Sequence, residues 1–102
     1  MRYLSRKLLR DFWAKHPQAE APLREWELRI KNGHFKGPSS FKRAFSGADV
    51  LPDNRVIFDI AGNKFRLVAH INYEFQILLV KFVGTHAEYD RIDAATVGRK
   101  GK

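Results

Sequence analysis

The stretch RVIFDIAGNKFRLVAHINYEFQILLVKFV, residues 55–83, decides the fold of this protein. Apolar and polar residues alternate over 55–60 and over 64–73, whereas 77–83 is almost wholly apolar. A period of two is typical of a β-strand with one buried face, and a continuous apolar run indicates a central or doubly covered strand. The connections between the three runs are short enough for hairpins. The sequence therefore predicts a three-stranded antiparallel meander.

The residues before this stretch show helical periodicity instead. Apolar side chains recur at spacings of one, three and four over 5–15, with Ser5 as the expected N-cap and Pro17 as the stop. A second apolar stripe follows Pro22 and ends at Gly33, where we expect a left-handed helix end. Two short helices should therefore pack together as a hairpin or lie across the sheet.

Residues 33–54 are rich in Gly, Pro and Ser, which predicts a loop with at most a short helical turn at 41–45. Lys36, Lys42 and Arg43 make this loop basic. We take these three side chains as candidate RNA-binding residues; the alternative is a solvated linker.

A short helix is expected after the sheet. Thr85 and Glu88 have the spacing of a capping box, which predicts a helix over 86–93. Residues 94–102 end in Arg-Lys-Gly-Lys and are expected to form a flexible basic tail.

Length and composition indicate one α+β domain over residues 1–102, with a small antiparallel sheet, two N-terminal helices packed on it and a short C-terminal helix. An apolar content of 44% is enough for a core. The absence of cysteine excludes disulfides, thiolate nucleophiles and Cys-ligated zinc. No run is long enough to span a membrane, so we expect a cytoplasmic protein.

The charge indicates the kind of partner. The chain has a net charge of +8, of which +7 falls in residues 1–43 and +1 in residues 44–102. Such an excess points to a polyanion, with nucleic acid first, then an anionic membrane or an acidic protein.

The middle strand of the meander places Lys64 and Arg66 on the face opposite its apolar residues. Two cations on one strand face suit a phosphate backbone; the alternative is a solvated outer face. Lys81 is the lone charge within 77–83, so it either lines a groove or forms an ion pair with Asp59. Asn63, in the preceding turn, joins Lys81 among the candidate RNA-binding residues.

His86, Tyr89 and Asp90 lie at i, i+3 and i+4 directly after the sheet, so they share one helix face. An imidazole and a phenol can exchange protons, and the carboxylate could orient the imidazole. The alternative for Tyr89 is an anchor in the core.

No P-loop, dinucleotide fingerprint, metal-ligand spacing or paired carboxylates are found, so neither a cofactor nor a metal is expected. What remains is metal-free chemistry on a polyanion. RNA carries its own nucleophile, the 2′-hydroxyl, so a base, an acid and cations at the phosphate are sufficient for cleavage.

Two elements give the sequence a family likeness. VIFDIAGNKFRLV at 56–68 and GTHAEYDRID at 84–93, with the loop NGHFKGP at 32–38, resemble the HigB family of bacterial toxins, and the likeness extends over about residues 4–93. The resemblance implies a RelE-like fold and an mRNA interferase activity, often exercised on translating ribosomes, so mRNA and rRNA are expected partners. It also implies a HigA-type antitoxin with a helix-turn-helix domain.

Carried over from the family motifs, the catalytic residues are Lys64, Arg66, His86 and Tyr89. We expect Arg66 to hold the scissile phosphate, Lys64 or His86 to take the 2′-hydroxyl proton, and His86 or Tyr89 to protonate the leaving oxygen. The alternatives are a noncatalytic basic module that binds RNA or the ribosome, and a relative that has lost cleavage.

Overall fold

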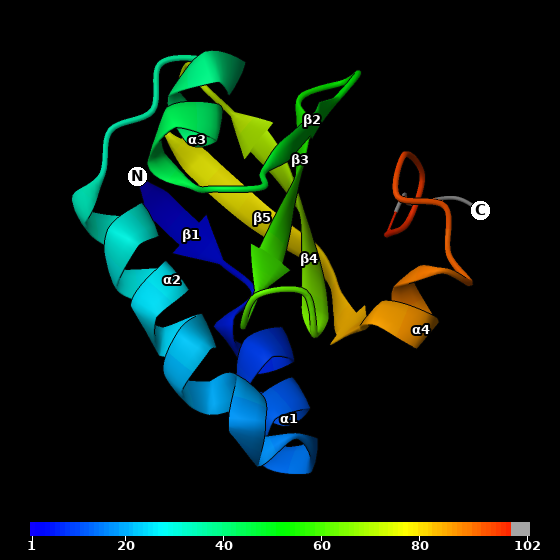
Figure 1. Cartoon of the computed structure of the whole chain (residues 1–102). Coiled ribbons are helices and arrows are strands. Elements are labelled where there is room, and N and C mark those ends of the chain that lie inside the picture. The colour runs from blue at the N-terminus through cyan, green and yellow to red at the C-terminus, as the bar shows by residue number, and fades with distance from the viewer. Residues whose placement is uncertain (99–102) are drawn as a thin grey trace.

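The computed structural model describes residues 1–98, so the end of the expected basic tail, 99–102, lies outside the described residues. Within them the chain forms an α+β fold (Figure 1). Its elements are, in chain order, β1 (Arg2–Leu4), α1 (Arg6–Lys15), a 3-10 turn (Pro17–Ala19), α2 (Glu20–Asn32), α3 (Pro38–Ala44), β2 (Asp49–Leu51), β3 (Arg55–Ile60), β4 (Phe65–Asn72), β5 (Ile77–Thr85) and α4 (His86–Tyr89). None of these helices is long and apolar enough to cross a membrane.

The strands form one five-stranded sheet in the order β1-β5-β4-β3-β2. The antiparallel meander of β3, β4 and β5 is confirmed. The expectation of a purely antiparallel sheet is wrong, because β1 pairs with β5 in parallel. Strand β2 adds an antiparallel edge on the other side. The apolar strand β5 therefore has a neighbour on each side, as its composition predicts.

Both N-terminal helices cover the same face of the sheet. Helix α1 packs on β5, and α2 packs on β1 and β3 (Figure 1). On β4 this core face carries Phe65, Leu67, Ala69 and Ile71, all of which are buried. The alternate residues of β4, Arg66 and His70 among them, point to the outer face. Alternation in the sequence thus separates the core face of β4 from its outer face, which is polar except at the buried Val68.

Two expected helix signals are wrong in detail. Ser5 stands at the N-cap position of α1, but its side chain makes no capping hydrogen bond. Gly33 ends α2 at φ −96°, not in the left-handed region. A Cβ at residue 33 would lie 2.6 Å from the Phe35 ring, so close packing rather than backbone handedness requires the glycine.

The loop at 33–54 is more ordered than its composition indicates. It contains α3, seven residues in place of the single turn expected at 41–45, and the short strand β2. Phe41 is fully buried and stacks on Phe35, with ring centroids 4.4 Å apart. The interpretation of this segment as a solvated linker is therefore wrong.

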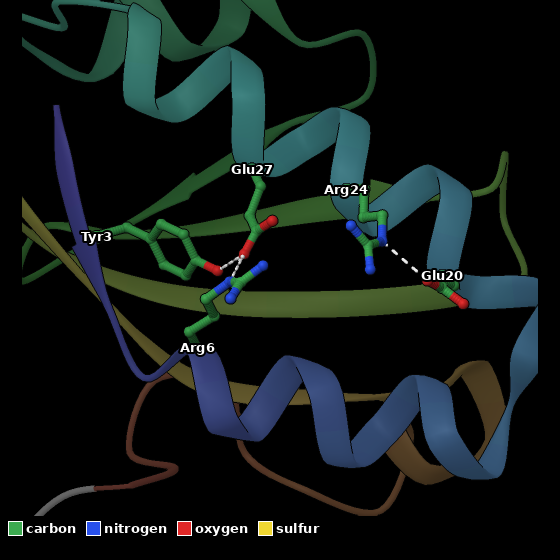
Figure 2. A network of polar contacts seen from close by, with 5 residues as sticks. All are labelled: Tyr3, Arg6, Glu20, Arg24 and Glu27. Carbon is green, nitrogen blue, oxygen red and sulfur yellow. Dashed lines mark hydrogen bonds and ion pairs between the residues drawn. The ribbon is translucent and has the colours of Figure 1, made fainter.

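A buried polar network joins β1 to both N-terminal helices (Figure 2). The Tyr3 hydroxyl donates a hydrogen bond to the Glu27 carboxylate, and Arg6 Nε lies 2.8 Å from the same oxygen. Burial alone would raise the pKa of Glu27, but the hydrogen bonds from Tyr3 and Arg6 outweigh it, so that this pKa is lowered. The network holds β1 against the helices with its carboxylate ionised.

Candidate active site

Arg66, the second residue of β4, is the hub of a polar cluster on the outer face of the sheet. Its Nη2 donates to Asn63 Oδ1 at 2.9 Å and lies 3.3 Å from His86 Nε2. Its Nε lies 2.8 Å from Asp59 Oδ1. The Arg66 side chain is 18% exposed, so the guanidinium is held in place yet still reached by solvent.

Strand pairing places these partners. Asp59 on β3 is the direct cross-strand neighbour of Arg66, which puts the two side chains on the same face. The connection after β3 turns through positive φ at Ala61 and Gly62 and brings Asn63 alongside. Three residues of the cluster, Asp59, Asn63 and Arg66, thus come from one hairpin.

The capping box predicted by the sequence is present and places the helical half of the site. Glu88 N donates to Thr85 Oγ1 at 3.2 Å, and Thr85 N donates to Glu88 Oε1 at 2.8 Å. The helix itself, α4, ends at Tyr89 rather than at residue 93. Because α4 starts directly at the end of β5, His86 meets the beginning of β4, where Arg66 lies.

His86 stands between a cation and a carboxylate. Its Nε2 faces Arg66 at 3.3 Å, and its Nδ1 lies 3.3 Å from Asp90 Oδ2. A guanidinium has only donors, so Nε2 is assigned as the acceptor, and the ring proton lies on Nδ1, toward Asp90. This tautomer leaves a lone pair at the centre of the cluster.

Tyr89 closes the cluster on the α4 side. Arg66 Cζ lies 5.2 Å from the centroid of the Tyr89 ring, and the Phe82 ring is 6.4 Å from it. Burial raises the pKa of the Tyr89 hydroxyl more than the Arg66 charge lowers it. The phenol therefore keeps its proton at neutral pH and is available as a donor. Tyr89 is not a fully buried core anchor.

Lys64 and Lys81 lie less centrally than the sequence indicates. Lys64 precedes β4 instead of beginning it, and its side chain is exposed, although its carbonyl accepts a hydrogen bond from His86 N at 3.2 Å. Lys81 sits at a β-bulge, because Val68 pairs with Phe82 and Ala69 with Val80. The ion pair considered between Lys81 and Asp59 is not formed, since Asp59 takes Arg66.

The other candidate RNA-binding residues lie on different elements. Lys36 is exposed in the connection before α3, and Lys42 and Arg43 are exposed on α3 itself. None of the hydrogen bonds or ion pairs of the described residues joins them to Arg66. Asn63, in contrast, touches Arg66 directly, so only one member of the predicted RNA-binding set lies in the cluster.

Sequence reasoning missed the role of Asp59. It was considered only as a partner for Lys81, although a lone acid between Phe58 and Ile60 on an alternating strand must share the outer face with Arg66. The signal that identifies it is the hairpin register.

Among residues 1–98, no group of three His, Asp or Glu side chains is placed to hold a metal ion.

Comparison with known proteins identifies the family. Residues 19–92 match the family model described as HigB_toxin, the RelE-like toxic component of a toxin-antitoxin system. The chain belongs to the HigB family. The resemblance of the strand and helix motifs to HigB toxins is thereby confirmed, and the α+β architecture agrees with a RelE-like fold.

Curated HigB proteins match nearly the whole chain. The protein is 35% identical over 104 residues to the mRNA interferase toxin HigB of Escherichia coli K12, covering 98% of this chain and all of the relative. The mRNA interferase HigB of Shigella flexneri matches at the same identity and coverage. That of Escherichia coli O6:H1 is 28% identical over 94 residues, covering 90% of this chain and 91% of the relative.

Proposed function

We propose that this HigB protein is an mRNA interferase, a metal-free endoribonuclease that arrests translation and growth. The observation that carries the proposal is the convergence of Arg66, His86 and Tyr89 within one solvent-accessible cluster. A phosphate-binding cation, a proton acceptor and a proton donor are the groups that cleavage by the RNA 2′-hydroxyl requires.

In the proposed reaction Arg66 holds the scissile phosphate. The 2′-oxygen attacks phosphorus as His86 Nε2 takes its proton, and the bond from phosphorus to the 5′-oxygen breaks as that oxygen receives a proton from Tyr89. The products are a 2′,3′-cyclic phosphate and a 5′-hydroxyl. The positive charge of Arg66 offsets the charge that develops on the phosphorane oxygens.

The geometry favours His86 over Lys64 as the base. Nε2 of His86 carries a lone pair beside Arg66, whereas Lys64 extends from an exposed turn. A phosphate bound to Arg66 would compete with His86 for the guanidinium N–H groups and so free Nε2 for the 2′-hydroxyl. Tyr89, protonated at neutral pH, serves as the acid. Asp90 holds the imidazole through Nδ1.

The partners follow from the same proposal. A toxic component of a toxin-antitoxin system has an antitoxin partner. We propose that this partner is of the HigA type, with a helix-turn-helix domain, and that the toxin acts in the cytoplasm on mRNA engaged with the ribosome. So small a domain gains from a ribosome that positions the substrate.

The proposal is tested by expressing the chain alone and together with the neighbouring open reading frame, while 5′ ends of mRNA are mapped. We expect growth arrest and new 5′ ends from the chain alone, and rescue by the neighbour. Arrest without new 5′ ends would instead favour a noncatalytic RNA-binding or ribosome-binding module.

The site assignment is tested with two adjacent residues of β4. We expect Arg66→Ala to lower cleavage by about a hundredfold to a thousandfold while the domain stays folded, because its side chain lies off the core face. Phe65→Ala, on the core face, should lower the free energy of unfolding by about 3–5 kcal/mol through a cavity. An Arg66→Ala protein as toxic as its parent would contradict the assignment.

The proton carriers are tested by replacing His86 with Leu and Tyr89 with Phe in one protein. We expect RNA cleavage to be lost while binding to RNA is retained, measured with a gel-based cleavage assay and fluorescence anisotropy. A binding module would keep its effect on growth after both replacements, which would refute the nuclease proposal.

A further inference from the structure

The positive charges of this protein are not equally available to a ligand. On the two N-terminal helices, Arg6 pairs with Glu27 and Arg24 with Glu20, each at 2.8 Å (Figure 2). Lys7 pairs with Asp11 in the same way. A carboxylate therefore offsets each of these three cations, which are poor candidates for binding phosphate.

A different situation holds where α2 ends and α3 lies. Among residues 1–98, Arg29 and Arg43 have no carboxylate within ion-pair distance. Both line a hollow of about 500 Å³. Its other polar lining residues are Asn32, His34 and Ser40, and no Asp or Glu contributes to its walls in the described part of the chain. The hollow thus offers hydrogen-bond donors to an anion without a competing carboxylate.

Arg29 is fixed in this hollow rather than free to move. Its Nη2 donates to the carbonyl of Ala44 at the end of α3, and its Cζ lies 4.2 Å above the ring of Phe45. A guanidinium has five N–H groups, so these contacts leave several donors for a ligand. Stacking on an aromatic ring also reduces the conformational entropy that binding would cost.

A second hollow continues from the first toward the candidate active site. It has a volume of about 330 Å³ and shares Arg29 and Phe45 with the first. Its far wall includes Gly62 and Asp59, and Asp59 is the residue that pairs with Arg66. The two hollows share Arg29 and Phe45, so between them they extend from Asp59 and the turn after β3 to Arg43.

Gly47 keeps one wall of the second hollow close to the sheet. Its φ of +81° is strained for other residues, and a Cβ there would lie 2.7 Å from Asp59 Oδ2. A larger residue here would be strained and would have to displace the Asp59 carboxylate, so glycine lets the loop between α3 and β2 approach the Arg66–Asp59 pair.

We propose that the hollow lined by Arg29, Arg43 and His34 is a subsite for a backbone phosphate of the RNA strand whose scissile phosphate lies at Arg66. This proposal rests on the proposed nuclease function. Because it binds the backbone, this subsite extends the contact with RNA beyond the cleaved bond without requiring a particular base. Arg43, a candidate RNA-binding residue from the sequence, shares this subsite with Arg29, which the sequence does not single out.

The test uses the full chain with His86→Gln, so that RNA is not consumed, and compares it with the same protein carrying Arg29→Gln and Arg43→Gln. The probes are a single-stranded RNA dodecamer and a trinucleotide, with affinity measured by fluorescence anisotropy over a range of salt. The matched control carries Lys7→Gln and Arg10→Gln, which remove the same charge from exposed positions of α1.

We expect the Arg29 and Arg43 changes to weaken dodecamer binding by about tenfold and to reduce the advantage of the dodecamer over the trinucleotide. The dependence of log affinity on log salt should become shallower by about 0.7 for each phosphate that the protein no longer neutralises. The control should leave the advantage of the dodecamer in place.

Two outcomes would overturn the subsite. One is an equal loss of dodecamer affinity in the α1 control, which would show a response to net charge alone. The other is an unchanged affinity for the dodecamer with a weakened affinity for purified ribosomes, measured alongside, which would assign the phosphate to rRNA instead of the substrate strand. A failure of the nuclease proposal is seen separately, as absence of dodecamer cleavage by the chain with His86 intact.

Discussion

Two arginines of this protein each lie 2.8 Å from a carboxylate, yet their surroundings differ. Glu27, the partner of Arg6, has a side chain only 7% exposed and also accepts a hydrogen bond from Tyr3 (Figure 2). Asp59, the partner of Arg66, has a side chain 27% exposed, and Arg66 extends further donors to Asn63 and His86. In the first ion pair the carboxylate is buried while the Arg6 side chain is 45% exposed, and the second ion pair opens onto a polar cluster.

We propose that an ion pair of the same kind stabilises the fold in one place and prepares a catalytic group in the other. The Tyr3–Arg6–Glu27 network joins three elements. Its carboxylate accepts hydrogen bonds from Tyr3 and Arg6, both within the fold. Asp59 instead forms an ion pair with Arg66 Nε, while Nη2 of the same guanidinium lies beside His86. We therefore expect loss of the Glu27 charge to affect stability and loss of the Asp59 charge to affect activity.

Among changes at the ion pairs, Glu27→Gln should produce the largest effect on stability. It removes a charged acceptor from a buried position, and hydrogen bonds to charged groups contribute more to stability than neutral ones. We expect the free energy of unfolding to fall by about 2 kcal/mol in urea denaturation, with the cleavage rate per folded molecule unchanged. A loss of cleavage without a loss of stability would break the comparison.

Asp59→Asn is the matched change at the other pair. The amide keeps the shape of the side chain but not its charge, so Arg66 is held less firmly toward His86. We expect cleavage to fall by about tenfold to a hundredfold, as for a misplaced catalytic group, with less than about 1 kcal/mol lost in urea denaturation. Equal losses of stability in Asp59→Asn and Glu27→Gln would remove the distinction.

Acid titration sharpens the comparison further. The pKa of Glu27 is lower in the folded chain than its ordinary value. The unfolded chain therefore binds the proton first, so this stabilisation is present above an ordinary Glu pKa of about 4.3 and is lost as pH falls through the lower folded value. The parent should lose stability over this acid range more steeply than Glu27→Gln, as followed by circular dichroism. Parallel curves would contradict the assignment.

The smallest effect is expected at an exposed ion pair. Lys7 and Asp11 lie one helical turn apart on α1, with side chains 84% and 60% exposed. Lys7→Gln should change the free energy of unfolding by less than about 0.5 kcal/mol, because solvent screens such pairs. A larger change in thermal denaturation would show that distance alone, rather than burial, ranks the ion pairs of this protein.

The parts of the fold that follow from local pattern were predictable. The alternation of β3 and β4, the apolar run of β5 and the stripe of α1 each depend on neighbours within one element. Strands β1 and β2 were not predicted, because three residues are too few to show a period. The parallel pairing of β1 with β5 joins residues more than seventy positions apart, and no local signal encodes it.

The candidate site was likewise predictable where its signals are local. Arg66 and His86 could be named from strand alternation, the capping box and the family motifs, and the fold brings them together. Asp59 was not recognised, because its partner depends on the register of a hairpin. Lys81 looked more central than it is, since a β-bulge that the sequence does not reveal displaces it from the regular pairing.

The sequence by itself determined the meander, the N-terminal helices, the polar face of β4 and the family to which the chain belongs. These depend on residue spacing, which secondary structure converts directly into faces. Only the tertiary structure decided which cations meet a carboxylate of another element and which line an open hollow. Arg6 and Arg29 look alike along α1 and α2, but Arg6 meets Glu27 of another helix and Arg29 lines an open hollow, because contacts between distant segments set the surroundings of each charge.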